Sequence, residues 1–261
     1  MIRVGIGGWT FEPWRGVFYP KGLPQARELD YASRNLTSIE INGTFYGTQK
    51  PESFRRWAAE TPDDFVFSLK GPRYATHRRV LGEAGESIER FFGSGVLELK
   101  QKLGPVLWQM PPTKRFDPED FAAFLALLPP TLDGRPIRHA VEVRHESFVT
   151  PDFVTLLRKH SVAPVLVDSD KHPMFADVAG DVLYLRLERT SEKVKTGYQP
   201  AALDTWAKRA QAWAAGGAPD DLPTIAAPAK SKRKRDVFVY MISGAKVRAP
   251  AAAMALIERL K

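Results

Sequence analysis

The sequence predicts an α/β protein, and within that class a (β/α)8 barrel of the TIM type. Two observations predict it. Eight short, apolar, strand-like segments recur along the 261 residues, and helical patterns lie between them. Each strand–helix unit averages roughly 33 residues, about what a βα unit with its loops requires. Regular alternation favours a parallel sheet covered by helices. The segments are residues 3–9, 38–46, 65–72, 104–112, 139–148, 163–169, 182–188 and 237–243.

Helix starts between these segments are marked by proline, which is favoured at the first helical position. The prolines that open helical patterns are Pro118, Pro151, Pro200 and Pro250. Residues 173–178 fit only a short helix, so the barrel is expected to be irregular there. A doubly wound open sheet is the alternative, because strand count does not prove closure. No domain boundary is visible, and we expect one barrel domain over residues 1–261.

Composition is that of an ordinary soluble globular protein, with 44% hydrophobic and 26% charged residues. Cysteine is absent, which excludes disulfides and thiolate chemistry and suits a reducing compartment. The N-terminus lacks a signal-peptide layout, and no apolar run reaches the length of a membrane span. We therefore expect a cytoplasmic protein with no membrane partner. The net charge of +8 permits anionic partners without identifying one.

Charged residues near the ends of the predicted strands need an explanation, because strands of a parallel barrel are buried on both faces. In AVEVRHESF, residues 140–148, Glu142 and Arg144 share one phase while Val141 and Val143 share the other. A buried charge is costly unless it is paired or reaches water. Water and ligands reach the carboxyl ends of barrel strands.

The same pattern recurs in order along the chain. Polar residues near the strand ends are Glu40, Asn42, Lys70, Gln109, Glu142, Arg144, Asp168 and Arg186. In a barrel the apolar phase faces the helices and the polar phase faces the axis. The sequence therefore predicts that these side chains converge on one mouth and form a ligand site. The alternative is a layer of structural ion pairs that fills the axis.

Loops at the predicted mouth add further candidates. The first, WTFEPWRGVFYPKG, is aromatic, and we interpret it as a packed subcluster rather than a lid or a stacking platform. The third carries Arg73, Arg78, Arg79 and His77, the one histidine that we place near the mouth and a candidate acid–base group. A plain hydrogen-bonding role is the alternative for His77. The eighth loop, ISGAKVRAP, gives a weak phosphate-site signal.

A basic run at residues 230–235 has the composition of a nucleic-acid patch. It precedes the last strand, so a barrel places it on the face opposite the mouth. We interpret it as a solvated, mobile loop.

Signature motifs for nucleotide loops, zinc proteases and serine hydrolases are absent. Glu40, Glu142 and Asp168 could form a carboxylate metal site, but three cationic side chains nearby reduce the need for a metal. We expect no tightly bound metal, and the sequence does not identify a cofactor.

Four segments resemble the DUF72, or YecE-like, family over essentially the full chain. They are GIGGWTFEPWRGVFYP, EINGTFYGTQKPESFRRWAAETPDDFVFSLKGPRYATHRR, GPVLWQMPP and AVEVRHESF. The resemblance implies a TIM-type barrel but no particular reaction. It also implies a set of recurrent polar positions, which includes Tyr46 and His77 beside those found from strand phase. The chain departs from the family pattern at Glu188-Arg189 and at Met241-Ile242-Ser243.

Together these observations favour an enzyme of the hydrolase or lyase type that acts on an anionic or phosphorylated sugar- or nucleotide-like ligand. Lys70, Arg144 and Arg186 would hold the anion, with Asn42, Tyr46 and Gln109 as further ligand-binding residues. Glu142, Asp168, Glu40 or His77 would transfer protons. A nucleic-acid-binding protein, such as a nuclease, is the alternative.

Overall fold

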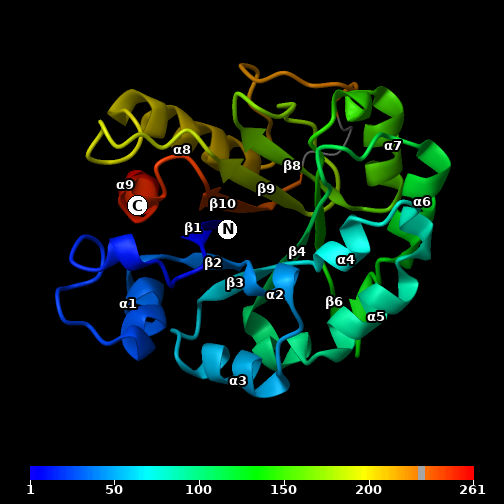
Figure 1. Ribbon diagram of the computed structural model, residues 1–261. Coiled ribbons are helices and arrows are strands. Elements are labelled where there is room, and N and C mark those ends of the chain that lie inside the picture. The colour runs from blue at the N-terminus through cyan, green and yellow to red at the C-terminus, as the bar shows by residue number, and fades with distance from the viewer. Residues whose placement is uncertain (229–232) are drawn as a thin grey trace.

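The computed structural model describes residues 1–228 and 233–261 and contains a closed barrel of eight parallel strands (Figure 1). The strands are β1 (Ile2–Gly7), β2 (Ser38–Ile41), β3 (Val66–Lys70), β4 (Leu103–Gln109), β7 (His139–Glu142), β8 (Ala163–Asp168), β9 (Val182–Leu187) and β10 (Asp236–Met241). β1 pairs with both β2 and β10, which closes the ring. The predicted (β/α)8 barrel is confirmed, and the open-sheet alternative is wrong.

Helices surround the barrel (Figure 1). They are α1 (Glu28–Asn35), α3 (Pro51–Ala59), α5 (Gly85–Gly93), α6 (Pro118–Leu127), α7 (Pro151–Lys159), α8 (Pro200–Ala214) and α9 (Ala249–Leu260), with the one-turn helices α2 (Gly43–Tyr46) and α4 (Arg73–Thr76) following β2 and β3. A small hairpin, β5 (Thr131–Leu132) and β6 (Arg135–Pro136), precedes β7. None of the helices in the described residues has the length and apolar character needed to cross a bilayer.

The segment between β8 and β9 differs from the prediction. The short helix expected at residues 173–178 does not form, and the chain there has no regular secondary structure. The segment forms a long-range backbone hydrogen bond instead, in which the amide of Ala176 donates to the carbonyl of Pro223 at 2.7 Å. The carboxylate of Asp177 accepts from the amides of Ile225 and Ala226 at 2.7 and 3.0 Å. These long-range bonds satisfy groups that a helix would have satisfied locally.

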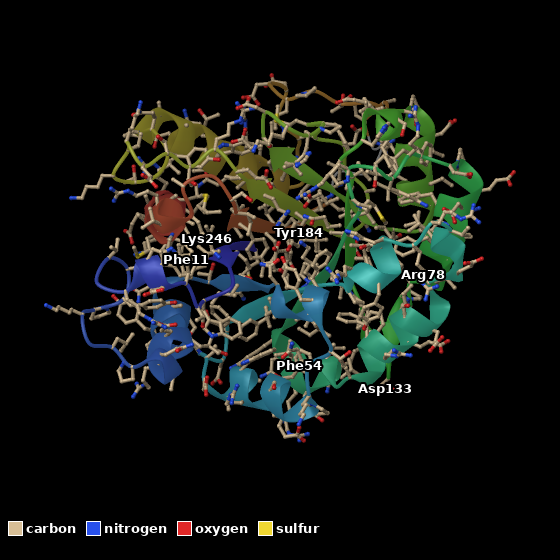
Figure 2. The ribbon with its side chains drawn as sticks, in the orientation of Figure 1. Phe11, Phe54, Arg78, Asp133, Tyr184 and Lys246 are labelled. Atoms are coloured by element: carbon tan, nitrogen blue, oxygen red, sulfur yellow. The ribbon has the colours of Figure 1, made fainter. Side chains whose placement is uncertain are left out.

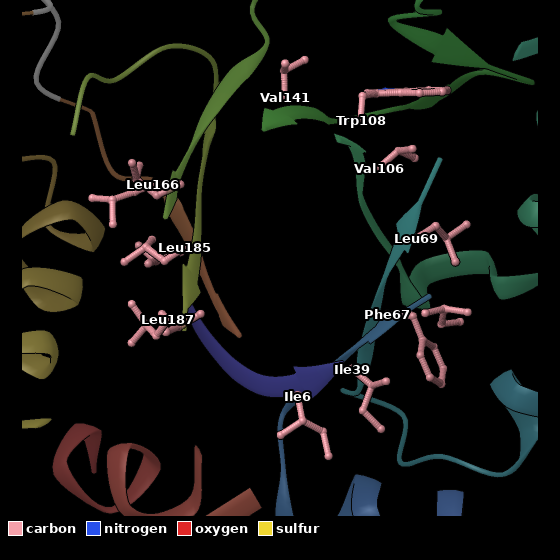
Figure 3. Packing of buried hydrophobic residues seen from close by; sticks show 14 of the residues in the cluster. Ile6, Ile39, Phe67, Leu69, Val106, Trp108, Val141, Leu166, Leu185 and Leu187 are labelled. Atoms are coloured by element: carbon pink, nitrogen blue, oxygen red, sulfur yellow. The ribbon is translucent and has the colours of Figure 1, made fainter. Parts of the chain in front are cut away.

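Side chains alternate across the barrel wall as the strand pattern predicts. Leu183, Leu185 and Leu187 of β9 belong to the large core between strands and helices, which we call the outer core. Tyr184 belongs to a separate buried cluster on the other face of the strands. In Figure 3 the labelled members of the outer core point away from the barrel axis. The polar residues that form the site lie on the inward phase, together with a smaller apolar cluster that includes Leu107 and Phe238.

Trp108 anchors one side of the outer core. Its ring contacts Phe91 and Phe124 edge-on, at centroid distances of 5.8 Å in each case. Its Nε1 donates to Nδ1 of buried His139 at 3.1 Å, and Nε2 of His139 lies 2.8 Å from the carbonyl of Pro129. These contacts fix the neutral imidazole with its proton on Nε2.

Candidate functional site at the mouth of the barrel

Arg186, on β9, occupies the centre of the barrel above Tyr184, which Figure 2 labels. Its Nη1 donates to Oε2 of Glu142 at 2.5 Å, and its Nη2 donates to Oε1 of Glu40 at 3.2 Å. All three side chains are buried. The two carboxylates, from β2 and β7, compensate a guanidinium whose side chain is only 3% exposed.

Glu142 has partners on both oxygens. Besides Arg186, it accepts from Nε of Arg144 at 2.6 Å and from Nε2 of Gln109 at 2.9 Å, both at Oε1. Burial alone would raise the pKa of Glu142, but Arg186 and Arg144 outweigh that effect and lower it to about 2. Glu142 is therefore a carboxylate at any ordinary working pH.

Tyrosine and serine hydroxyls form the floor beneath these charges. The hydroxyl of Tyr184 donates to Oε2 of Glu40 at 2.6 Å and lies 2.9 Å from Oγ of Ser68. The hydroxyl of Tyr240 lies 2.7 Å from Oγ of Ser38. Burial, followed by the charge of Glu40, raises the pKa of Tyr184 well above its usual value. The floor is thus neutral and fully hydrogen-bonded, as a buried polar layer must be.

Lys70, at the end of β3, differs from the arginines because no carboxylate of the described residues lies within ion-pair distance of it. Its Nζ donates to Oε1 of Gln109 at 2.7 Å and lies 3.9 Å from the centroid of the Phe45 ring. Burial and then the neighbouring charge of Arg186 lower its pKa to about 8. Lys70 is a partly desolvated amine in the wall of the mouth.

A cavity of about 420 Å³ opens at this end of the barrel. Its lining residues are Gly7, Gly8, Thr10, Trp14, Asn42, Tyr46, Lys70, Gln109, Arg144, Arg186, Met241, Ile242, Ser243 and Lys246. Four of them are basic, and none of the described lining residues is acidic. Glu40 and Glu142 lie beneath the cavity, behind Arg186. The accessible surface of the site is therefore cationic.

The first and eighth loops meet at one side of this cavity. Nε1 of buried Trp14 donates to the carbonyl of Lys246 at 2.8 Å, and Nζ of Lys246 lies 4.5 Å from the centroid of Phe11 (Figure 2). Trp14, Phe18 and Tyr19 are buried against one another. The interpretation of the first loop as a packed subcluster is confirmed.

The structure brings all six predicted ligand-binding residues together. Those that line the cavity are Asn42, Tyr46, Lys70, Gln109, Arg144 and Arg186. Glu40 and Glu142 belong to the same network but have no exposed surface. Their geometry favours positioning of the arginines over direct contact with a ligand.

Asp168 does not join the others, which corrects the expectation that all strand-end polar residues converge. Its carboxylate binds Nε of Arg189 at 2.7 Å and accepts from the hydroxyl of Tyr198 at 3.1 Å. It lines a neighbouring cavity of about 520 Å³ with these two residues. The reason is strand phase: Asp168 shares the outward phase of Leu166, whereas Val165 and Val167 point to the axis.

His77 also lies outside the set of cavity-lining residues. It is exposed, with Nδ1 3.1 Å from Oγ1 of Thr76 and its ring 5.6 Å from that of Phe45. His77 is not the only histidine near the mouth. His172, in the loop after β8, also lies there, because burial and then the nearby charge of Arg144 lower the pKa of His172. Nδ1 of His172 is buried without a hydrogen-bond partner among the described residues. Strand phase gave no signal for this loop residue.

Both departures from the family pattern lie at the mouth. The side chain of Glu188 is 8% exposed, with Oε1 3.8 Å from Nη1 of Arg186. Arg189 pairs with Asp168. Met241, Ile242 and Ser243 line the cavity beside Lys246, a lining residue that sequence reasoning missed. The described residues contain no group of three His, Asp or Glu side chains arranged to hold a metal ion.

Fold and site together define a (β/α)8-barrel protein with a basic cavity at the carboxyl ends of its strands. The chain belongs to the family described as "Protein of unknown function DUF72", which matches residues 3–261. The UPF0759 protein YecE of Escherichia coli K12 is 31% identical over 148 residues, which are 57% of this chain and 50% of YecE. YunF of Bacillus subtilis is 29% identical over 161 residues, 59% of this chain and 54% of that protein. The chain thus spans about half the length of these curated relatives.

Solved structures show the same fold. A DUF72 family protein from Thermotoga maritima superposes with a TM-score of 0.74 at 24% identity and covers 100% of this chain and 99% of its own. One from Enterococcus faecalis gives 0.71 at 18% identity, covering 100% and 95%. The protein SacUVDE gives 0.54 at 9% identity, covering 99% of both chains. These likenesses concern the fold alone.

Proposed function

We propose that this protein is an enzyme of the hydrolase or lyase type that acts on an anionic or phosphorylated sugar- or nucleotide-like small molecule in the mouth cavity. One observation carries the proposal: four basic side chains and no described acidic one line a cavity of about 420 Å³. That volume lies within the usual range for small-molecule sites. Enzymes of this fold place their active sites at the same end of the barrel.

Charge balance explains why the ligand should be an anion. Glu40 and Glu142 both pair with Arg186, and Glu142 also pairs with Nε of Arg144. Lys70 and Lys246 have no carboxylate of the described residues at ion-pair distance, so their charges remain available to a ligand. In a partly desolvated cavity such charges attract a phosphate or carboxylate more strongly than in water.

The roles of the carboxylates follow from their partners. Glu142, with a pKa of about 2 and both oxygens occupied, serves in this proposal to hold Arg186 and Arg144 in place. Glu40 helps to hold Arg186 in place through Nη2 of that guanidinium. Asp168 and His77 lie outside the cavity, so in this proposal a residue that lines the cavity transfers the proton. Lys70 is such a residue.

Thermal unfolding with a panel of anions tests this proposal. A ligand at about 100 times its Kd stabilises the folded state by about 2.7 kcal/mol, so phosphate, sulfate and sugar phosphates should raise Tm while neutral sugars should not. Arg144→Met should lose the shift. Arg34→Met is the matched control, since Arg34 lies on the surface of α1 and pairs with Asp30. Equal shifts in both variants would contradict the proposal.

Nucleic-acid binding is the second candidate, and the exposed Arg73 and Arg79 beside α4 favour it together with the net charge of +8. Salt-dependent retention on immobilised DNA that is lost on neutralising Arg73, Arg78 and Arg79 would support it. If retention survives those substitutions, or never occurs, this candidate fails.

A further inference from the structure

We propose that Lys70 is a nucleophile that forms a Schiff base with the carbonyl group of an anionic aldehyde or ketone held in the mouth cavity. The inference rests on the proposed function and narrows its substrate class to carbonyl compounds that carry a phosphate or carboxylate.

The position of Lys70 carries the inference. The side chain is 7% exposed, yet it lines the cavity, so its amine reaches a ligand while remaining largely dry. Its one hydrogen-bond acceptor among the described residues is Oε1 of Gln109, and the face of the Phe45 ring covers another side. The two carboxylates nearest to it are committed to arginines. Nothing in the described wall holds this amine as a permanent cation.

Lys102 shows what a structural lysine looks like in the same protein. It is equally buried, but its Nζ donates to the carbonyls of Ala58 and Thr61 at 2.6 and 2.7 Å and to Oγ1 of Thr61 at 3.2 Å. Three acceptors saturate that ammonium, and it lies outside the mouth cavity. Lys70 has one acceptor and an open side.

The lowered pKa of Lys70 fits this role. Burial and the charge of Arg186 bring it to about 8, so roughly a tenth of the side chains are neutral amines at pH 7. An unperturbed lysine would be neutral in fewer than about one molecule in a thousand. The same two features, desolvation and an adjacent cation, activate amine nucleophiles in general.

The step balances without any further reactant. The amine lone pair attacks the carbonyl carbon, and the nitrogen passes one of its protons to the carbonyl oxygen to give a carbinolamine. The hydroxyl group then takes a proton from solvent and leaves as water, and the nitrogen lone pair forms the protonated carbon–nitrogen double bond to Nζ. Arg144 and Lys246, which line the same cavity, would hold the anionic end of the substrate during this step.

Reductive trapping tests the inference. The 261-residue chain is incubated with glyceraldehyde 3-phosphate and limiting borohydride, and the adduct is located by intact-mass measurement and peptide mapping. We expect one adduct per chain on the peptide that contains Lys70, formed at least ten times faster than on any other lysine. Sulfate should protect it, and unphosphorylated glyceraldehyde should label it far more slowly.

Lys70→Arg keeps the charge and should abolish the adduct, whereas Lys208→Met, at an exposed position of α8 outside the cavity, should retain labelling at Lys70. Mapping of the unsubstituted protein decides the matter even if a variant fails to fold. Labelling spread evenly over surface lysines, or concentrated on Lys246, would overturn the inference. If sulfate still raises Tm but no adduct forms, the Schiff base is wrong and the anion site stands. If no anion stabilises the protein, the proposed function itself fails.

Discussion

Nε of Arg144 lies 2.6 Å from Oε1 of Glu142, two positions earlier in the chain. The pair explains the opposite charges on one face of a barrel strand. Glu142 is buried, while the Arg144 side chain is 21% exposed and reaches the cavity. One member therefore belongs to the barrel interior and the other to the ligand site.

This division predicts unequal effects of two substitutions. Glu142→Gln leaves Arg186 without one of its two counter-charges and should lower the free energy of unfolding by about 3–5 kcal/mol. Arg144→Met should cost about 1 kcal/mol or less, because its charge is partly solvated, yet weaken sulfate binding at least tenfold. Urea denaturation and calorimetric titration measure the two quantities.

Glu188→Gln is the matched control for Glu142→Gln. Glu188 also lies near Arg186, but its Oε1 has no hydrogen-bond partner among the described residues. Glu188→Gln should lower the free energy of unfolding clearly less than Glu142→Gln does. Equal decreases in the free energy of unfolding for the two variants would show that Glu142 is no more important to the network than Glu188.

Sulfate affinity should depend on pH through Lys70. Sulfate keeps its charge near pH 8, so a change in affinity there reports on the protein. Lys70 is cationic below its pKa of about 8 and neutral above it, and sulfate binding should weaken as pH rises through that value. Lys70→Arg should keep affinity level over pH 7–9. A level profile in the unsubstituted protein would contradict this assignment.

Acid should destabilise the fold through His139. Burial lowers its pKa to about 4 from the ordinary 6.5, which means that the folded protein favours the neutral ring. Between pH 6.5 and 4 the unfolded chain binds a proton that the folded one does not, so the free energy of unfolding falls as pH falls, by up to about 3 kcal/mol. The stabilisation is fully present above pH 6.5.

His139→Gln can accept from Trp108 and donate to Pro129 without titrating, and should remove most of this acid-dependent loss. His77→Gln, at an exposed site, should change it much less than His139→Gln. Stability curves measured from pH 4 to 7 compare the three proteins. An unchanged slope in His139→Gln would show that other groups cause the loss.

The basic run at residues 230–235 should be dispensable for ligand binding. Residues 230–232 lie outside the described part of the chain, so the expected solvated, mobile loop stays a prediction there. Arg233 pairs with Asp181 before β9, at the end of the barrel opposite the mouth. Replacing Lys230, Lys232 and Lys234 by serine should leave Tm and sulfate affinity nearly unchanged. A folded variant that no longer binds sulfate would place this run at the site.

Strand periodicity predicted much of this arrangement because each barrel strand alternates strictly between axis and helices. Glu40, Lys70, Glu142 and Arg186 were found in this way, and all lie on the inward phase. Asp168 shows the limit of reasoning from position alone. It ends its strand as the others do, but the phase of its neighbours turns it outward.

Loop residues were harder to predict, since their placement depends on long-range contacts that have no local period. Lys246 reaches the cavity because the buried indole of Trp14, 232 positions away, bonds its carbonyl. The absent helix at residues 173–178 has a similar cause, the bonds between Asp177 and residues 225–226. Neither contact leaves a mark in the local sequence.

The hydrogen bonds beneath the cavity return to the strand from which they start. They run from Lys70 on β3 through Gln109, Glu142, Arg186 and Glu40 to Tyr184, and Tyr184 contacts Ser68 on β3 again. Because these bonds connect strands on different sides of the barrel, they restrain the shape of its cross-section. The inner outline of the mouth is therefore stiff, and a ligand must fit it as it stands. Changes in ligand preference between relatives would then come from the rim, at positions such as Tyr46, Ser243 and Lys246, while the braced interior stays the same.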